Sequence, residues 1–189
     1  MRLTTLLPAG ALVLAAFILA GCPVTLVERA VEARSAEDIV TDNKIVIAVN
    51  RIMADLGTVK ASTEIYEQRL LVTGLFDDKA LYDQFRQQVG EVEGVKALYW
   101  HATYMSEADQ ASANLLGWDD VVILDNKVGV NLIAEKDVAD VNFRVTADSF
   151  GTVYLLGRAR SQHELDLALA AARGTEGAKK VVNYVEVRP

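Results

Sequence analysis

The strongest constraint on the fold is an internal repeat, because three pairs of segments match at one spacing of 83 residues. The pairs are Asp42-Asn43-Lys44-Ile45 with Asp125-Asn126-Lys127-Val128, Leu71-Val72-Thr73-Gly74 with Tyr154-Leu155-Leu156-Gly157, and Glu93-Gly94-Val95-Lys96 with Glu176-Gly177-Ala178-Lys179. A repeat of this kind is one structural unit used again. We therefore expect two copies of a single small fold.

Each copy begins with a helical pattern, in which apolar residues recur every three or four positions. They are Ile45, Val49, Ile52 and Leu56 in the first copy, and Val121, Leu124, Val128 and Leu132 in the second. Asp38 and Asp119 are acids of the kind that favour the first turn of a helix.

Two strands follow the helix in each copy. Alternation predicts the first strand at Val59, Ala61, Thr63 and Ile65, and at Phe143, Val145 and Ala147. In the second copy Asp148-Ser149-Phe150-Gly151 predicts a turn before a strand at Thr152–Leu156. The first copy has Tyr66-Glu67-Gln68-Arg69 there, without a glycine, so its hairpin uses another turn type or is longer. Gly74 and Gly157 are expected to end the second strands.

A second helix and a last strand complete each copy. The helical positions are Leu81, Phe85 and Val89, then Leu165, Ala168, Leu169 and Ala172, and the last strands are Val95–Thr103 and Lys179–Val187. The fold class is therefore α+β, with the order αββαβ twice. Each copy is a three-stranded mixed sheet covered on one face by two helices. Units of about 65 residues are marginally stable alone, so we expect the copies to pack on each other.

The N-terminus has the pattern of an export signal. The apolar run Ala11–Ala20 is too short for a spanning helix, which needs about 20 residues, and suits a signal peptide over residues 1–21. Leu19-Ala20-Gly21-Cys22 resembles the bacterial lipobox, which implies a covalent lipid on Cys22 and cleavage before it. An ordinary signal peptide with a stray cysteine, or an uncleaved anchor, remains an alternative. Residues 22–37 would be a lipidated tether or would add a helical turn.

Composition excludes several classes of function. One cysteine and two histidines leave no intramolecular disulfide and little for a metal site, and a net charge of −7 disfavours nucleic-acid binding. The chain lacks the Gly-x-Ser-x-Gly, Walker A and Gly-x-Gly-x-x-Gly motifs. Neither His101 nor His163 has a nucleophile at a recognisable spacing. We expect no enzyme, no metal and no cofactor besides the covalent lipid.

The element order and the repeated motifs resemble the BON domain, over residues 38–104 and 119–189 with a linker at 105–118. Behind a lipobox, two tandem BON domains resemble the periplasmic lipoproteins of the DolP/OsmY-like family. The resemblance implies a non-enzymatic lipoprotein of the cell envelope that faces the periplasm from the outer membrane and binds phospholipid. Pro23, in place of an aspartate after the cysteine, favours the outer over the inner membrane. A role near the outer-membrane protein assembly machinery is also implied.

The candidate lipid-binding residues lie on the first helix of the second copy. In proteins of this family that helix contacts anionic phospholipid, and the matching positions here are Ile123 and Lys127. Trp118, Val130 and Ile133 extend this set as apolar residues without assured burial. Asp119, Asp120 and Asp125 would oppose an anionic surface. The alternatives are packing of these residues against the first copy or the linker, and a protein partner, which would make the chain an interaction module or chaperone-like adaptor.

Overall fold

The computed structural model describes residues 32–57 and 60–189, and Glu32–Pro189 is one compact unit. The predicted signal peptide at 1–21, Cys22, the tether up to residue 31 and Val59 lie outside the described residues. In the part of the chain that is described, no helix has the length and apolar character needed to cross a bilayer.

The order αββαβ occurs twice, as predicted, and both sheets are mixed. The first copy consists of α2 (Ala36–Asp55), β1 (Ala61–Tyr66), β2 (Arg69–Phe76), α3 (Lys79–Gly90) and β3 (Ala97–Tyr104). The second consists of α5 (Trp118–Ala134), β4 (Phe143–Ala147), β5 (Thr152–Ala159), α6 (Gln162–Gly174) and β6 (Lys180–Val187). The central strand pairs antiparallel with the strand before it and parallel with the strand after it. Two short helices, α4 (Glu107–Ser112) and η1 (Asp140–Asn142), were not predicted.

The predicted helix stripes form the two cores. All four α5 positions are buried, as are the four predicted on α6, and they pack against the outer face of the sheet β4–β5–β6. In the first copy Ile45, Val49, Phe85 and Val89 are buried on the sheet β1–β2–β3, and Ile52, Leu56 and Leu81 are half-buried against them.

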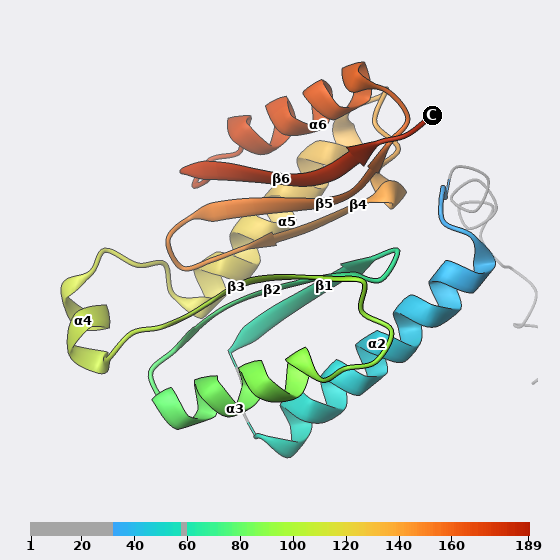
Figure 1. Cartoon of the computed structure of the whole chain (residues 1–189). Coiled ribbons are helices and arrows are strands. Elements are labelled where there is room, and N and C mark those ends of the chain that lie inside the picture. The colour runs from blue at the N-terminus through green and yellow to red at the C-terminus, as the bar shows by residue number, and fades with distance from the viewer. Residues whose placement is uncertain (1–31, 58–59) are drawn as a thin grey trace, which may run out of the picture. The chain divides into compact units, whose positions relative to one another are not determined.

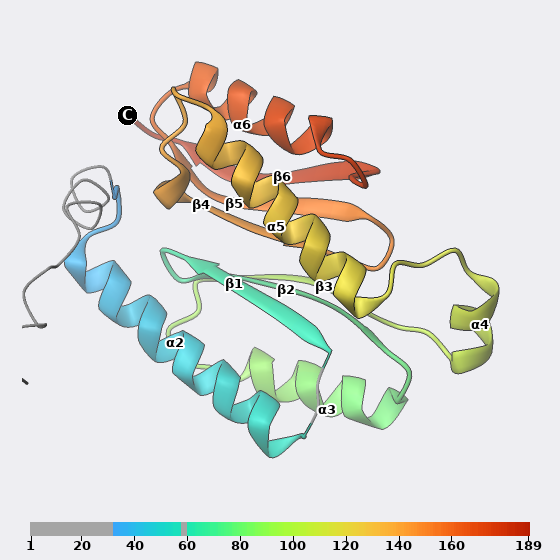
Figure 2. The same cartoon turned by 180° about the vertical axis from the view of Figure 1, so that it is seen from behind.

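The two copies pack through the sheet faces that their own helices leave uncovered. Tyr66 and Leu71 from the first sheet, with Tyr154 and Leu156 from the second, form a third buried cluster. Tyr99 stacks on Tyr184 with ring centroids 4.0 Å apart. The result is four layers, with α2 and α3 outside one sheet and α5 and α6 outside the other (Figures 1 and 2). The prediction that the copies pack on each other is confirmed.

Gly74 and Gly157 do not end their strands, which continue to Phe76 and Ala159. Each glycine lies inside the central strand, where the first strand of its copy begins. A Cβ on Gly157 would lie 2.0 Å from the carbonyl oxygen of Asn142, and one on Gly74 would lie 2.6 Å from that of Lys60. The glycine is therefore needed for a close backbone approach, and the positive φ of 150–152° follows from the same crossing.

The hairpin without glycine is a two-residue turn held by a buried carboxylate. Glu67 and Gln68 both adopt positive φ, 51° and 63°, which is unfavourable for residues with a Cβ. Asp42 of α2 accepts hydrogen bonds from both backbone N–H groups, at 2.9 and 2.7 Å, and from the side-chain amide of Gln68 at 2.8 Å. Arg34 pairs with the same carboxylate at 3.1 Å.

The hairpin of the second copy is stabilised differently. Gly151 takes the positive φ, and Asp148 accepts from the backbone N–H groups of Phe150 and Thr152 within the turn. Asp125, which is the repeat counterpart of Asp42, therefore has no such turn to hold. It accepts a backbone hydrogen bond from Ala147, and its Oδ1 is buried without a partner in the described residues. Burial raises the pKa of Asp125 to about 7.

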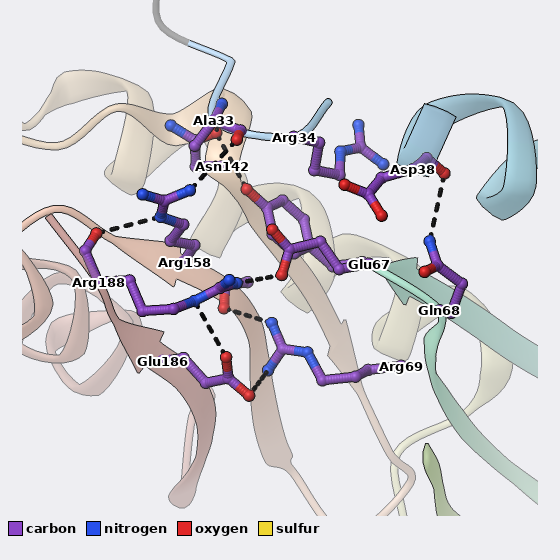
Figure 3. A network of polar contacts seen from close by, with 12 residues as sticks. Ala33, Arg34, Asp38, Glu67, Gln68, Arg69, Asn142, Arg158, Glu186 and Arg188 are labelled. Carbon is purple, nitrogen blue, oxygen red and sulfur yellow. Dashed lines mark hydrogen bonds and ion pairs between the residues drawn. The ribbon is translucent and has the colours of Figure 1, made fainter. Parts of the chain in front are cut away.

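The chain enters the folded part along the junction between the copies. The Ala33 N–H donates to Asn142 at 2.7 Å, and Arg158 donates to the Ala33 carbonyl at 3.3 Å. Figure 3 shows this network beside the first hairpin, where Arg69 and Arg188 also pair with carboxylates of the opposite copy. Helix α2 then begins at Ala36, behind a capping box of Ser35 and Asp38. Residues 32–35 are thus a strap bound to both copies and do not add a helical turn.

Asp42→Ala should destabilise the protein by roughly 3–5 kcal/mol, because it leaves the N–H groups of a strained turn without their acceptor and removes one of the two carboxylates that pair with Arg34. Urea unfolding of residues 22–189 with Cys22→Ser measures this. Asp55→Ala, at an exposed position of the same helix, is the control and should change stability by less than about 0.5 kcal/mol. Equal effects of the two substitutions would contradict the role of Asp42.

Asp125→Asn should stabilise the protein at pH 8 and have little effect at pH 4. A carboxyl whose pKa is raised by folding binds its proton more tightly in the folded state, so its contribution to stability is lost as the pH rises from about 4 through about 7. Burial and, to a lesser extent, the Asp125 carboxylate raise the pKa of Glu64 to about 7, so removing that charge also favours the folded state at high pH. Asn cannot ionise, so the gain should reach roughly 1–2 kcal/mol at pH 8. Thermal unfolding at both pH values, with Asp120→Asn as control, tests this, and a gain of equal size at pH 4 would contradict it.

Candidate functional site

Helix α5 forms because its buried stripe and its N-terminal acids agree. Gly117 is the N-cap and provides no side-chain cap, while Asp119 and Asp120 lie in the first turn, where negative charge favours the helix. The buried stripe fixes one side of α5 against β4 and α6. The opposite side therefore faces away from the sheet, and it holds the candidate residues.

Four apolar side chains on this outer side are exposed. Val122 is 41%, Ile123 52%, Val130 63% and Ile133 67% accessible to solvent. Packing against the first copy or the linker was one expectation for these residues, and the described structure contradicts it. An apolar surface of this kind on a folded domain is typical of a contact with a membrane or another macromolecule.

Three of the predicted site residues lie together. Ile123, Lys127 and Val130 line a shallow groove that is closed on its far side by Thr175 and Glu176, after α6. Lys127 pairs with Glu176 at 3.1 Å, and both side chains remain largely exposed. Such a surface ion pair contributes little to stability, so the ammonium can exchange this partner for another anion at small cost.

Trp118 belongs to a different part of the surface. It is 39% exposed and lines a cavity at the junction of the copies, together with Leu75 and Phe76 of β2 and Leu116 of the linker. The five predicted residues therefore do not form one continuous surface. Ile123, Lys127 and Val130 share the groove, Ile133 is exposed further along α5, and Trp118 is exposed beside the cavity near the helix start.

The acids around the site are fewer than the sequence indicated. Asp125 was expected to oppose an anionic surface, but its carboxyl lies between α5 and the neighbouring strands and its raised pKa reduces its charge near neutral pH. Glu64 of β1 and Arg144 of β4 are near enough to influence each other's pKa there. Asp119 and Asp120 remain as the exposed acids of α5.

One of the two histidines is engaged between the sheets, away from the outer side of α5. His101 lies between the sheets, with Nε2 2.8 Å from the Tyr184 hydroxyl, and burial lowers its pKa. Within residues 32–57 and 60–189, no group of three or more His, Cys, Asp or Glu side chains is arranged to hold a metal ion.

Comparisons with known proteins found one curated relative and two solved structures that are similar to this chain. The chain is 26% identical over 153 residues to a protein of Anaplasma centrale described as "Uncharacterized protein in gshII 5'region", over 79% of this chain and 96% of that protein. Two solved structures of CdsD, a structural protein of the type III secretion system of Chlamydia trachomatis, were also found. The first structure is 9% identical to this chain, with a TM-score of 0.32. The match covers 77% of this chain and 93% of the CdsD chain. The second structure, of the C-terminal domain of CdsD, is 8% identical with a TM-score of 0.29. That match covers 76% of this chain and 64% of the CdsD chain.

The family model described as BON domain matches residues 120–189, which run from the first turn of α5 to the C-terminal residue. BON domains are generally non-enzymatic binding modules, and they indicate an envelope protein of the periplasm or the membrane. This match identifies residues 120–189 as a BON domain, and the fold of the second copy is consistent with it.

Proposed function

We propose that this protein is a non-enzymatic outer-membrane lipoprotein that faces the periplasm and binds phospholipid through the outer side of α5. The observation that carries the proposal is the exposure of Ile123, Val130 and Ile133, each more than half accessible, on a helix whose other side is fully packed. The first copy has the same topology as residues 120–189, so we assign it as a second BON domain.

Membrane contact at this site depends mainly on apolar insertion. Each side chain that passes from water into the acyl region contributes about 1–2 kcal/mol. Asp119 and Asp120 oppose Lys127, and Lys127 already has Glu176 as a partner, so net attraction to anionic headgroups is weak here. Binding through α5 should therefore persist on neutral lipid and at high salt.

A lipid on Cys22 makes this weak site effective. A single acyl chain gives marginal binding, whereas further chains give a stable anchor. With the anchor in place, the contact through α5 becomes an intramolecular event at high effective concentration. We assign the protein to envelope integrity on this basis, with proximity to the outer-membrane protein assembly machinery as its setting.

A protein partner is the second candidate for the same groove. Asn126 and Asn131 line it beside Ile123 and Val130, and side-chain amides at the rim of an apolar surface suit hydrogen bonds to a polypeptide. In that case the protein would be an interaction module or chaperone-like adaptor of envelope assembly.

Flotation of residues 22–189 with Cys22→Ser on phosphatidylcholine vesicles in high salt separates these functions. We expect the protein to float, and Ile123→Glu with Val130→Glu to weaken binding by about tenfold or more, because two apolar insertions are lost. Phe150→Glu, at an exposed apolar position of the same copy, should float unchanged. Absence of flotation on every lipid mixture would contradict the lipid function and favour the adaptor.

A further inference from the structure

A cavity lies at the junction of the two copies, next to the start of α5. Its volume is about 320 Å³, at the lower end of the range of about 300–1,000 Å³ that is usual for small-molecule sites. Residues of β2, of the linker and of the β4–β5 turn line it together, so the cavity depends on the packing of the copies. The linker with α4 lies at this end of both sheets (Figures 1 and 2).

The linker is fixed beside the cavity by hydrogen bonds. The Leu116 N–H donates to the Ser149 carbonyl of the β4–β5 turn at 2.8 Å. The side-chain amide of Gln110 donates to the Met105 carbonyl at 2.9 Å. Leu116, Gln110 and Ser149 all line the cavity. The walls are therefore in place before a ligand binds, which lowers the entropic cost of binding.

One part of the lining is apolar. These side chains come from the first copy, from the linker and from the start of α5, and they include Leu75, Phe76, Leu81, Leu115, Leu116 and Trp118. Trp118 is 39% accessible, so its ring is available to a ligand. A partly exposed tryptophan beside a cavity is well suited to contact with the apolar side chain of a ligand.

Two side chains of opposite charge complete the lining. Lys60 precedes β1 and Asp77 follows β2, and both are exposed. Neither forms an ion pair within residues 32–57 and 60–189. Asp148, the other charged residue of the lining, already accepts three hydrogen bonds within its own hairpin. The cavity thus offers one cation and one anion, which suits a ligand that carries both charges.

The spacing of these two charges matches the ends of a short peptide. Ala61, which follows Lys60, pairs with Gly74, and Asp77 lies three residues beyond Gly74, or roughly 10 Å along the chain. A dipeptide or tripeptide spans about 7–10 Å between its ends. Its ammonium group would pair with Asp77 and its carboxylate with Lys60, while its apolar side chains pack against the leucines and Trp118.

We propose that this cavity is a binding site for a short apolar peptide whose amino and carboxyl ends are both charged. The site is separate from the groove on α5, so the proposal does not depend on the proposed lipid function. Trp118, which lies apart from the other predicted lipid-binding residues, belongs to this peptide site.

Isothermal titration calorimetry of residues 22–189 with Cys22→Ser against the dipeptide leucyl-phenylalanine tests the proposal. We expect this dipeptide to bind, and glycyl-glycine, which has the same charged ends without apolar side chains, not to bind. Trp118→Ala should weaken binding by about tenfold or more, because an aromatic contact is lost. The chain has two tryptophans, so Trp100→Phe leaves Trp118 alone, and its fluorescence should change when the dipeptide binds.

Each of the two charges is tested against the end of the peptide that it should meet. Lys60→Gln should weaken binding of leucyl-phenylalanine by about threefold to fivefold, because an exposed ion pair is lost, and should leave binding of the C-terminal amide unchanged. Asp77→Asn should weaken binding of the unmodified dipeptide equally and leave binding of its N-acetyl form unchanged. Lys44→Gln and Asp55→Asn alter exposed charges of α2 outside the cavity and should bind every form as the parent does.

Two results would overturn the inference. One is the absence of binding at millimolar dipeptide in both calorimetry and fluorescence, and the other is equal affinity for the unmodified, amidated and acetylated forms. Ile123→Glu with Val130→Glu should bind the dipeptide as the parent does, so a failure of the α5 site in flotation leaves the peptide site to be judged by its own titration. Circular dichroism of each variant confirms that the fold is retained.

Discussion

The rest of the structure depends on the contact between the two sheets. A three-stranded sheet has two faces, and the helices of each copy cover one of them. The other face carries Tyr66 and Leu71 in the first copy, and Tyr154 and Leu156 in the second. Neither copy is large enough to fold back over this face by itself, so each buries the face of the other. The outer helix surfaces are thereby fixed in position and left free.

The fold could be predicted from the sequence because its main signals are periodic. Apolar residues spaced three and four positions apart located the helices, and alternation of apolar and polar residues located the first strands. The repeat at a spacing of 83 residues indicated that both copies have the same fold. The role of Gly157 could not be predicted, because it depends on a backbone oxygen of Asn142 that is distant until β4 pairs with β5. A glycine at the apparent end of an apolar run is equally consistent with a turn.

The candidate site was predicted in part. The exposure of Ile123, Val130 and Ile133 followed from the angular position of the buried stripe on α5, which the sequence contains. The position of Trp118 could not be predicted in this way, since it depends on how β2 and the linker approach the start of α5. Identical residue types then acquire different roles from their neighbours, as Asp42 and Asp125 show.

The strap at residues 32–35 determines how mechanical load enters the protein. Ala33 is hydrogen-bonded to Asn142 and Arg158 of the second copy (Figure 3). Arg34 pairs with Asp42 of the first copy. Tension applied along the N-terminal chain is therefore shared between both halves before it reaches the first turn of α2. If the proposed lipid on Cys22 anchors the protein, a force on the N-terminal chain would act on both copies together. The hydrogen bonds and the ion pair of the strap would then protect α2 from separating from its sheet.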